Sequence, residues 1–290
     1  MKHEEGTFKS ADGLDLYYQS WLPDGDAKAT IVIVHGMGEH GGRYPHVVNA
    51  LVPKGYAIYA ADHRGHGRSP GKRMFVESWS DYLDDLGLFI KVVKGKVEKR
   101  PVQSGSTALS LPKRPFFLYG HSMGGNIALN TVLRHPDGYN GVIASAPAVG
   151  KLDIPPVLAF ISRALSRLAP AMQVKANLEI SDISRDPAEA AAYADDPLVQ
   201  GFGTPRFAVE IASSAEWAIA HAAEFKPPLL IVHGDGDNIV NVSASRKFFT
   251  KVPHQDKKLI VYEGGVHESH NDIHRDEVIA DIEQWLEAHL

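Results

Sequence analysis

Cysteine is absent from this 290-residue chain. Without thiols, the chain cannot form a disulfide framework, a zinc–thiolate site, an iron–sulfur cluster or a cysteine nucleophile. Long apolar runs are also absent, and none approaches the roughly 18–20 residues that a membrane span needs. The first residues, Met1–Glu5, lack the apolar stretch of a signal peptide. Together these features predict a cytoplasmic protein.

An excess of basic residues is missing as well. Thirty Lys and Arg face 35 Asp and Glu, so the formal net charge is −5. This balance argues against a nucleic-acid partner. With 44% hydrophobic and 22% charged residues, the composition is that of an ordinary globular chain. The length predicts one large domain, or one domain plus a small one.

Short apolar runs alternate with helix-like stretches along most of the chain. The expected strands are Ile31–Val34, Tyr56–Ala60, Phe116–Tyr119, Val142–Ala144, Leu229–Val232 and Leu259–Tyr262. The expected helices are Tyr44–Val52, Trp79–Lys99, Met123–Arg134, Ser243–Thr250 and Asp272–His289. This alternation predicts an α/β fold, a mostly parallel central sheet with helices on both faces. Thr7–Ser10 and Leu14–Trp21 instead predict an antiparallel hairpin.

Residues 147–227 interrupt the alternation, with several helical patterns and no convincing strand. We therefore expect a core of residues 1–146 and 226–290 and a helical cap of residues 147–225. In the cap, one apolar face of a helix near Pro156–Ala169 is predicted by the helical spacing of Ile154, Val157, Leu158, Ile161, Leu165 and Leu168. The Ser-, Gly- and Pro-rich stretch Val102–Lys113 predicts a surface loop.

A nucleophile elbow is predicted at Gly120-His121-Ser122-Met123-Gly124, which has the pattern G-x-S-x-G between a strand and a helix. A serine hydroxyl is a weak nucleophile and must be lifted clear of the chain to meet a base. The sharp turn that does this packs the backbone tightly, so its flanking positions need glycine.

An acid and a base follow in the order that such an elbow requires. Asp237 lies after one expected strand and is favoured over Asp235, because the longer loop can turn back. His267 lies after the next expected strand and is favoured over His270 and His274 as the nearest to its end. These three histidines also have a spacing that suggests a metal site, but no H-E-x-x-H motif supports it.

A dinucleotide-binding loop is the main competing interpretation. Gly36–Gly41 satisfies G-x-G-x-x-G after an expected strand, and Asp62 stands about where a ribose-binding acid would. Against it, a two-strand segment precedes the motif, and short glycine motifs carry a high false-positive risk.

Several motifs together resemble the α/β-hydrolase family, and within it the monoacylglycerol lipases and lysophospholipase-like enzymes. They are His35–Tyr44, Asp62–Ser69, Gly120–Gly125 and the Tyr193 to Pro197 stretch of the cap. The resemblance spans the whole chain. It implies an α/β-hydrolase fold with a helical cap, and it explains Gly36–Gly42 as the loop that presents the Met37 amide.

The resemblance also implies the roles of individual residues. Ser122 would be the nucleophile, Asp237 and His267 its triad partners, and the amides of Met37 and Met123 the oxyanion donors. A polar cluster would receive the glycerol end of the substrate at Glu39, Arg43, Tyr193 and His270. A purely structural Glu39–Arg43 ion pair is the alternative for these two residues.

The implied activity is hydrolysis of monoacylglycerol to fatty acid and glycerol through an acyl-enzyme, with no cofactor and no metal. The expected partner is a small lipid ester. A lysophospholipase, a broad carboxylesterase or a peptidase remains an alternative, as, more remotely, does an NAD(P)-binding or non-catalytic binding protein. The apolar cap face either packs onto the core or lines an acyl tunnel or a lipid surface. The second case predicts peripheral membrane contact, with Arg163 and Arg167 near anionic headgroups.

Overall fold

The computed structural model describes residues 1–98, 114–151, 156–175 and 179–290, so the expected loop at Val102–Lys113 and the residue Ile154 lie outside the described residues. The strands are β1 (Lys2–Lys9), β2 (Asp15–Leu22), β3 (Ala29–Val34), β4 (Tyr56–Ala61), β5 (Phe116–His121), β6 (Gly141–Ser145), β7 (Val174–Lys175), β8 (Phe202–Gly203), β9 (Leu229–Gly234) and β10 (Lys257–Tyr262). The α-helices are α1 (Pro45–Leu51), α2 (Ser80–Glu98), α3 (Met123–Arg134), α4 (Pro156–Leu168), α5 (Pro187–Asp195), α6 (Pro205–His221), α7 (Val242–Lys251) and α8 (Arg275–Glu287). Short 3-10 helices are η1 (Gly41–Arg43), η2 (Val52–Lys54), η3 (Ile180–Asp182), η4 (Ala222–Glu224) and η5 (Ser269–Asn271).

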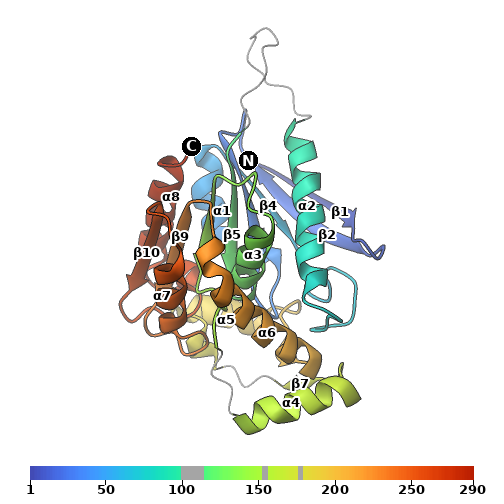
Figure 1. Ribbon diagram of the computed structural model, residues 1–290. Coiled ribbons are helices and arrows are strands. Elements are labelled where there is room, and N and C mark those ends of the chain that lie inside the picture. The colour runs from blue at the N-terminus through green and yellow to red at the C-terminus, as the bar shows by residue number, and fades with distance from the viewer. Residues whose placement is uncertain (99–113, 152–155, 176–178) are drawn as a thin grey trace.

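One eight-stranded sheet runs through the molecule in the order β1-β2-β4-β3-β5-β6-β9-β10. β1 and β2 form an antiparallel hairpin, and β2 pairs antiparallel with β4. The pairs from β4 to β10 are parallel. The predicted hairpin and mostly parallel sheet are therefore confirmed. The carboxyl ends of the parallel strands share the lower edge in Figure 1, which faces α4, α5 and α6.

Apolar side chains alternate between the two faces of this sheet, as the pleat requires. Ile31 and Ile33 of β3 belong to the cluster that includes α1 and α8. Val32 and Val34 belong to the cluster that includes α2 and α3. Helices therefore cover both faces, as expected (Figure 1).

The backbone of α3 packs directly onto the end of β3 at Gly124. A Cβ atom at this position would overlap the carbonyl oxygens of Val34 and His35. β3 and β5 are paired neighbours, so the turn between β5 and α3 brings the helix across the end of β3. Only glycine permits so close an approach of two backbones. This contact fixes the distance between the start of α3 and the loop that follows β3.

The insertion between β6 and β9 holds α4, α5 and α6, together with a small β7–β8 pair that the sequence did not predict. α6 contributes Phe207, Ile211 and Ala218 to the main apolar cluster. Ser214 Oγ of α6 also donates to Asn126 Oδ1 of α3 at 2.7 Å. Because α6 packs as part of the core, the division into core (1–146, 226–290) and cap (147–225) remains a proposal.

Polar pairs fasten α5 and its flanks to the core. His46 Nε2 lies 2.7 Å from Glu189, and Arg275 donates to Asp186 at 2.6 Å. His40 Nε2 lies 2.9 Å from Asp196, just after α5. This part of the insertion is therefore held over the strand ends by side chains from three separate core segments.

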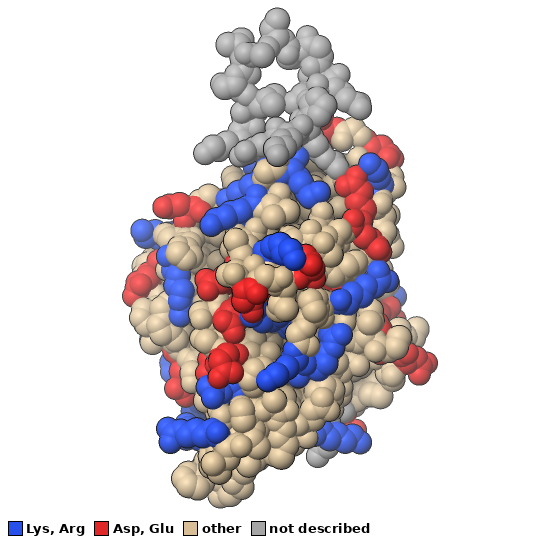
Figure 2. Space-filling view, turned by 90° about the vertical axis from the view of Figure 1, so that its right-hand side faces the viewer, with Lys and Arg blue, Asp and Glu red and all other residues tan. Residues whose placement is uncertain are grey.

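The apolar stripe of α4 is partly turned to solvent: Val157, Ile161 and Leu168 are exposed and Leu165 is half-buried, whereas the side chain of Leu158 lies outside the described residues. It packs against α6, and the buried side includes Ser166, whose carbonyl accepts from Arg206 at 3.1 Å. Val157, Phe160 and Leu168 are 71%, 72% and 83% exposed. Core packing, one of the two alternatives for this face, is therefore wrong for Val157 and Leu168. Figure 2 shows the lower end of the molecule as largely uncharged surface with basic side chains beside it.

Among the residues that the structure describes, no helix combines the length and the apolar character needed to cross a membrane.

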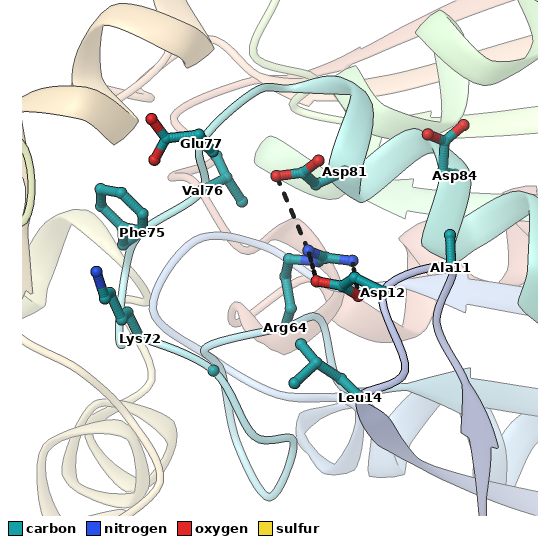
Figure 3. A pocket seen from close by; sticks show the side chains of 11 residues that line it. Ala11, Asp12, Leu14, Arg64, Lys72, Phe75, Val76, Glu77, Asp81 and Asp84 are labelled. Atoms are coloured by element: carbon teal, nitrogen blue, oxygen red, sulfur yellow. Dashed lines mark hydrogen bonds and ion pairs between the residues drawn. The ribbon is translucent and has the colours of Figure 1, made fainter.

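Arg64 ties the β1–β2 turn to α2. Its guanidinium donates to Asp85 at 2.6 and 2.8 Å and to Asp12 at 3.1 Å, and it lies 3.8 Å from Asp81. Arg64, Asp12 and Asp81 also line a surface pocket of about 400 Å³ (Figure 3). The Arg64 guanidinium already contacts three carboxylates. We therefore interpret the pocket as the junction between the β1–β2 hairpin and α2, and not as a ligand site.

The Gly124 contact predicts a large difference between two identical substitutions. Gly124→Ala should lower the free energy of unfolding by about 3 kcal/mol or more, because backbone atoms must move apart. Gly87→Ala, in α2, has no neighbouring atom within 4 Å of the new methyl group and should raise stability by about 0.5–1 kcal/mol. Urea denaturation of both variants measures the difference. Equal effects at the two positions would contradict the proposed close packing.

Candidate active site

Ser122 sits in the sharp turn between β5 and α3, as the G-x-S-x-G pattern predicts. Its φ is 51° and its ψ is −116°, a strained conformation for a residue with a side chain. The turn is held because the Ser122 amide donates to the Ser145 carbonyl at 2.9 Å and the Ser122 carbonyl accepts from the Ala148 amide at 3.0 Å. Strain that is maintained by neighbouring strands indicates a functional position.

Asp237 and His267 meet at the carboxyl ends of β9 and β10. The Asp237 Oδ2 atom lies 2.7 Å from His267 Nδ1, and both side chains are buried. The other carboxylate oxygen accepts from the amides of Ile239 and Val240 at 2.8 and 2.9 Å. Asp235, the rejected alternative, is exposed and instead accepts from the Gly264 amide.

The two groups shift each other's protonation. Burial alone would raise the pKa of Asp237, but the facing His267 and the hydrogen bonds outweigh it and hold that pKa well below its usual range. Burial alone would lower the pKa of His267, but the Asp237 carboxylate outweighs it, so the pKa is raised. The imidazole is thus a stronger base than a free histidine.

Ser122 and His267 line one small pocket together with Met37, Glu39 and Tyr193. Its volume is about 30 Å³, which has room for a water molecule but not for an acyl chain. No hydrogen bond joins Ser122 Oγ to His267 in the described structure, and such contacts often tighten only when substrate binds. The pocket as described therefore does not hold a whole lipid ester.

The loop after β3 brings a backbone amide to the same pocket. The Gly36 amide donates to Glu39 Oε1 at 2.5 Å, which bends the loop around Met37. Within the described part of the chain, no group accepts a hydrogen bond from the Met37 amide. Met123 is the first residue of α3, where helix amides have no intrahelical partner. Both positions suit the stabilisation of an oxyanion.

Arg43 lies between two carboxylates, one of which the sequence analysis missed. It donates to Glu268 at 2.6 and 2.9 Å and to Glu39 at 3.2 Å, and its guanidinium lies 4.6 Å from the Tyr193 ring centroid. Glu39, Arg43 and Tyr193 are thus brought together, as expected. Glu268 follows His267 directly, and only that adjacency in the sequence pointed to it.

The two carboxylates respond differently to this shared cation. Burial raises the pKa of Glu39, and its single bond to Arg43 does not cancel the effect. Burial opposes ionisation of Glu268 as well, but the bidentate Arg43 contact outweighs it and lowers the pKa. Glu39 also accepts from the Tyr44 hydroxyl at 2.7 Å, so each of its contacts is a donor that suits the ionised form.

His270 lies close enough to this cluster for the charges of Glu268 and Arg43 to act on it, and its expected role at the glycerol end stays a prediction. It is fully buried, stacked on Tyr44 with ring centroids 4.8 Å apart, and it does not line the pocket. Neither ring nitrogen has a hydrogen-bond partner in the described structure. Sequence spacing placed His270 near His267, but the η5 turn carries its ring inward.

The competing interpretations find other contacts. His274 lies 2.7 Å from Arg185 and stacks on Tyr262, whereas His267 and His270 both lie against the His121 ring. Asp62 accepts from the amides of Gly41 and Arg68 and is buried, which leaves it no position for a ribose. The glycine loop is occupied by the Glu39 side chain, not open to a pyrophosphate.

Buried neutral histidines predict a loss of stability in acid. Burial lowers the pKa of His63 to about 3 and those of His66 and His270 to about 4. The unfolded chain binds these protons near pH 6.5, so stability is full above that pH and falls towards pH 4, by up to about 1.4 kcal/mol per pH unit for each histidine. Urea unfolding between pH 7 and 5 measures the slope.

His270→Phe keeps a flat ring against Tyr44. It should reduce the slope of unfolding free energy against pH by up to about 1.4 kcal/mol per pH unit, the contribution of one proton. His135→Phe, at an exposed position after α3, is the control and should leave it unchanged. The same slope in the wild type and in His270→Phe would be evidence against a buried neutral His270.

Comparisons with known proteins identify the family of the chain. A family model described as serine aminopeptidase S33 matches residues 25–274. A monoacylglycerol lipase from Mycolicibacterium smegmatis is 35% identical over 288 residues, covering 99% of this chain and 98% of that protein. Phospholipase YtpA from Bacillus subtilis is 29% identical over 266 residues, covering 90% of this chain and 96% of that protein.

Solved structures give the same result. The crystal structure of Paleococcus ferrophilus monoacylglycerol lipase superposes with a TM-score of 0.81 at 29% identity, covering 95% of this chain and 99% of that chain. The resemblance drawn from the motifs is thereby confirmed. The chain belongs to the serine aminopeptidase S33 family, and it is a serine hydrolase with the α/β-hydrolase fold.

Proposed function

We propose that the protein hydrolyses monoacylglycerol to fatty acid and glycerol, with Ser122, His267 and Asp237 as its catalytic triad. The observation that carries the proposal is the 2.7 Å contact between Asp237 and His267 in the pocket that Ser122 lines. The relatives named as monoacylglycerol lipases support the choice of substrate.

The mechanism follows from the roles of these groups. His267 takes the Ser122 proton through Nε2 while Ser122 Oγ attacks the ester carbonyl. Asp237 holds His267 in the tautomer that carries its proton on Nδ1 and stabilises the charged ring. The Met37 and Met123 amides stabilise the oxyanion. His267 then protonates the leaving glycerol oxygen, and water, activated by His267, releases the fatty acid.

The polar cluster beside His267 would receive the glycerol end. Glu39, Tyr193 and Glu268 line the pocket with His267, and Arg43 is bound to both carboxylates. Carboxylate oxygens accept hydrogen bonds from alcohol groups, which a plain alkyl leaving group lacks. The ion pair would thus be structural and substrate-binding at once. This cluster favours a polyol ester over a simple alkyl ester.

The acyl chain would leave the catalytic pocket towards the cap. The exposed stripe on α4 supports a lipid contact, because exposed apolar patches on soluble proteins mark interaction sites. Arg163 and Arg167 are both exposed on the same helix and suit anionic headgroups. The proposal therefore has a cytoplasmic enzyme in peripheral contact with a membrane or micelle through α4.

A substrate panel tests the activity. Long-chain monoacylglycerol should have a higher kcat/KM than lysophospholipid, p-nitrophenyl butyrate or a peptide amide, and Ser122→Ala should abolish turnover of each because no nucleophile remains. Because one relative is named Phospholipase YtpA, lysophospholipid is the alternative substrate that the panel must test. A higher kcat/KM for lysophospholipid would contradict monoacylglycerol as the preferred substrate. Activity retained in Ser122→Ala would contradict the assignment of the triad.

Glu268→Gln tests the glycerol end within the same panel. The variant should raise KM for monoacylglycerol several-fold and leave KM for p-nitrophenyl butyrate unchanged, because it removes binding outside the reacting carbonyl. Equal changes for the two substrates would make the cluster structural only.

The lipid contact predicts a selective effect of charge on α4. Phe160→Asp and Leu168→Asp should leave the melting temperature and the turnover of soluble esters nearly unchanged, because both side chains already face solvent. Turnover of monoacylglycerol in anionic vesicles should fall several-fold. Leu290→Asp is the matched control, an exposed apolar side chain at the far end of the molecule from α4 (Figure 1). A vesicle activity equal to that of the control would contradict the contact.

A further inference from the structure

A second histidine, His233, contacts the Asp237 carboxylate and does not line the pocket. His233 is the last residue but one of β9, a strand that is buried throughout, and its side chain is fully buried. Its Nε2 lies 3.1 Å from Asp237 Oδ2 and 2.8 Å from the Val240 carbonyl oxygen. Its Nδ1 lies 2.8 Å from Ser245 Oγ of α7. Asp237 Oδ2 thus lies between two imidazole rings.

The partners of His233 determine its tautomer. Asp237 Oδ2 and the Val240 carbonyl are both acceptors, so Nε2 must carry a proton that it shares between them. Ser245 has a hydroxyl that can donate to Nδ1, so a neutral ring with its proton on Nε2 satisfies every contact. The opposite tautomer would direct an Nε2 lone pair at a carboxylate in a buried site, which is strongly unfavourable.

We propose that His233 is a positioning residue for the reaction: its Nε2–H group fixes the Asp237 carboxylate in the orientation in which Asp237 can hold His267. The inference rests on the proposed triad. It assigns a role to a buried histidine that the mechanism above does not use.

His233, Asp237 and Val240 contact one another and so hold the loop after β9 in place. The Val240 amide donates to Asp237 Oδ1, and the Val240 carbonyl accepts from His233, whose Nε2–H also faces Asp237 Oδ2. Without His233, Oδ2 keeps one donor, His267, and the carboxylate, although still held at Oδ1 by the amides of Ile239 and Val240, has more freedom to rotate about its χ2 torsion. Rotation by a few tens of degrees is enough to misalign the bond to His267 Nδ1.

Several charged groups and one aromatic ring surround His267. Asp237 faces its Nδ1, the carboxylates of Glu268 and Glu39 add negative charge, and the His121 ring lies 4.8 Å away. His270 lies behind His121. Of these groups, Asp237 is the one hydrogen-bonded to His233, so we expect a substitution at His233 to act on His267 through the acid.

Three variants separate positioning from general stability. His233→Phe keeps a flat ring but removes the donor, and His233→Gln keeps an N–H donor that can reach the place of Nε2. Ser245→Ala keeps the ring and removes the group that favours its tautomer. Each is measured for kcat and KM on a soluble ester between pH 5 and 9, for melting temperature, and for the low-field proton resonance of the His267–Asp237 hydrogen bond.

His233→Phe should lower kcat at least tenfold with little change in KM, because the defect concerns the reacting groups and not binding. A misaligned Asp237 stabilises the charged ring less, so the pKa of His267 should fall, the acidic limb of kcat/KM should move to lower pH, and the low-field resonance should shift. His233→Gln should retain kcat within about threefold, and Ser245→Ala should fall between the two. A purely structural role would lower the melting temperature without moving the limb or the resonance.

Asp237→Asn is measured in parallel to keep the two proposals apart. Wild-type activity in Asp237→Asn would overturn the triad itself. Loss of activity in Asp237→Asn, with wild-type kcat, pH profile and resonance in His233→Phe, would overturn the role of His233 alone. If His233→Phe does not fold, the proposal is tested by comparing kcat in His233→Gln and Ser245→Ala. Wild-type kcat in Ser245→Ala together with a loss of kcat in His233→Gln would contradict the tautomer argument.

Discussion

The contact between the Gly124 backbone and the Val34 and His35 carbonyls sets the spacing on which the candidate active site depends. Ser122 precedes this glycine by two residues, and Met37 follows His35 by two. The proposed nucleophile and both proposed amide donors are therefore held by one contact of backbone with backbone. Such a contact has no side-chain rotamers through which it can relax. Donors that are fixed before the reaction need no reorganisation during it.

Much of this site could be predicted because parallel strands end at a common edge. The chain order of Ser122, Asp237 and His267 and their positions after three apolar runs were enough to expect them together. The orientation of single side chains was less accessible. His270 has the right spacing but turns inward at η5, where stacking on Tyr44 decides its position. Glu268 and His233 owe their contacts to segments far away in the sequence, Arg43 and Ser245, which no local pattern connects to them.

The fold of the core was predicted more completely than that of the insertion, for a physical reason. A strand that is buried on both faces must be apolar throughout, so the central strands are visible in the sequence. An amphipathic helix reveals only that its two sides differ. The α4 stripe was visible in this way, but which side meets the protein depends on the small side chains of α4 and on α6, and here the helix uses its polar side.

The outward stripe on α4 has a colloidal consequence. Val157, Phe160 and Leu168 stay in water at a cost that grows with the apolar area they present. Any amphiphile above its critical concentration, or a second copy of the chain at high protein concentration, offers the stripe a way to lower that cost. The same surface would thus govern both the dispersal of the protein in solution and the proposed contact with a lipid interface. Detergent and concentration will therefore set the apparent size of the particle in solution.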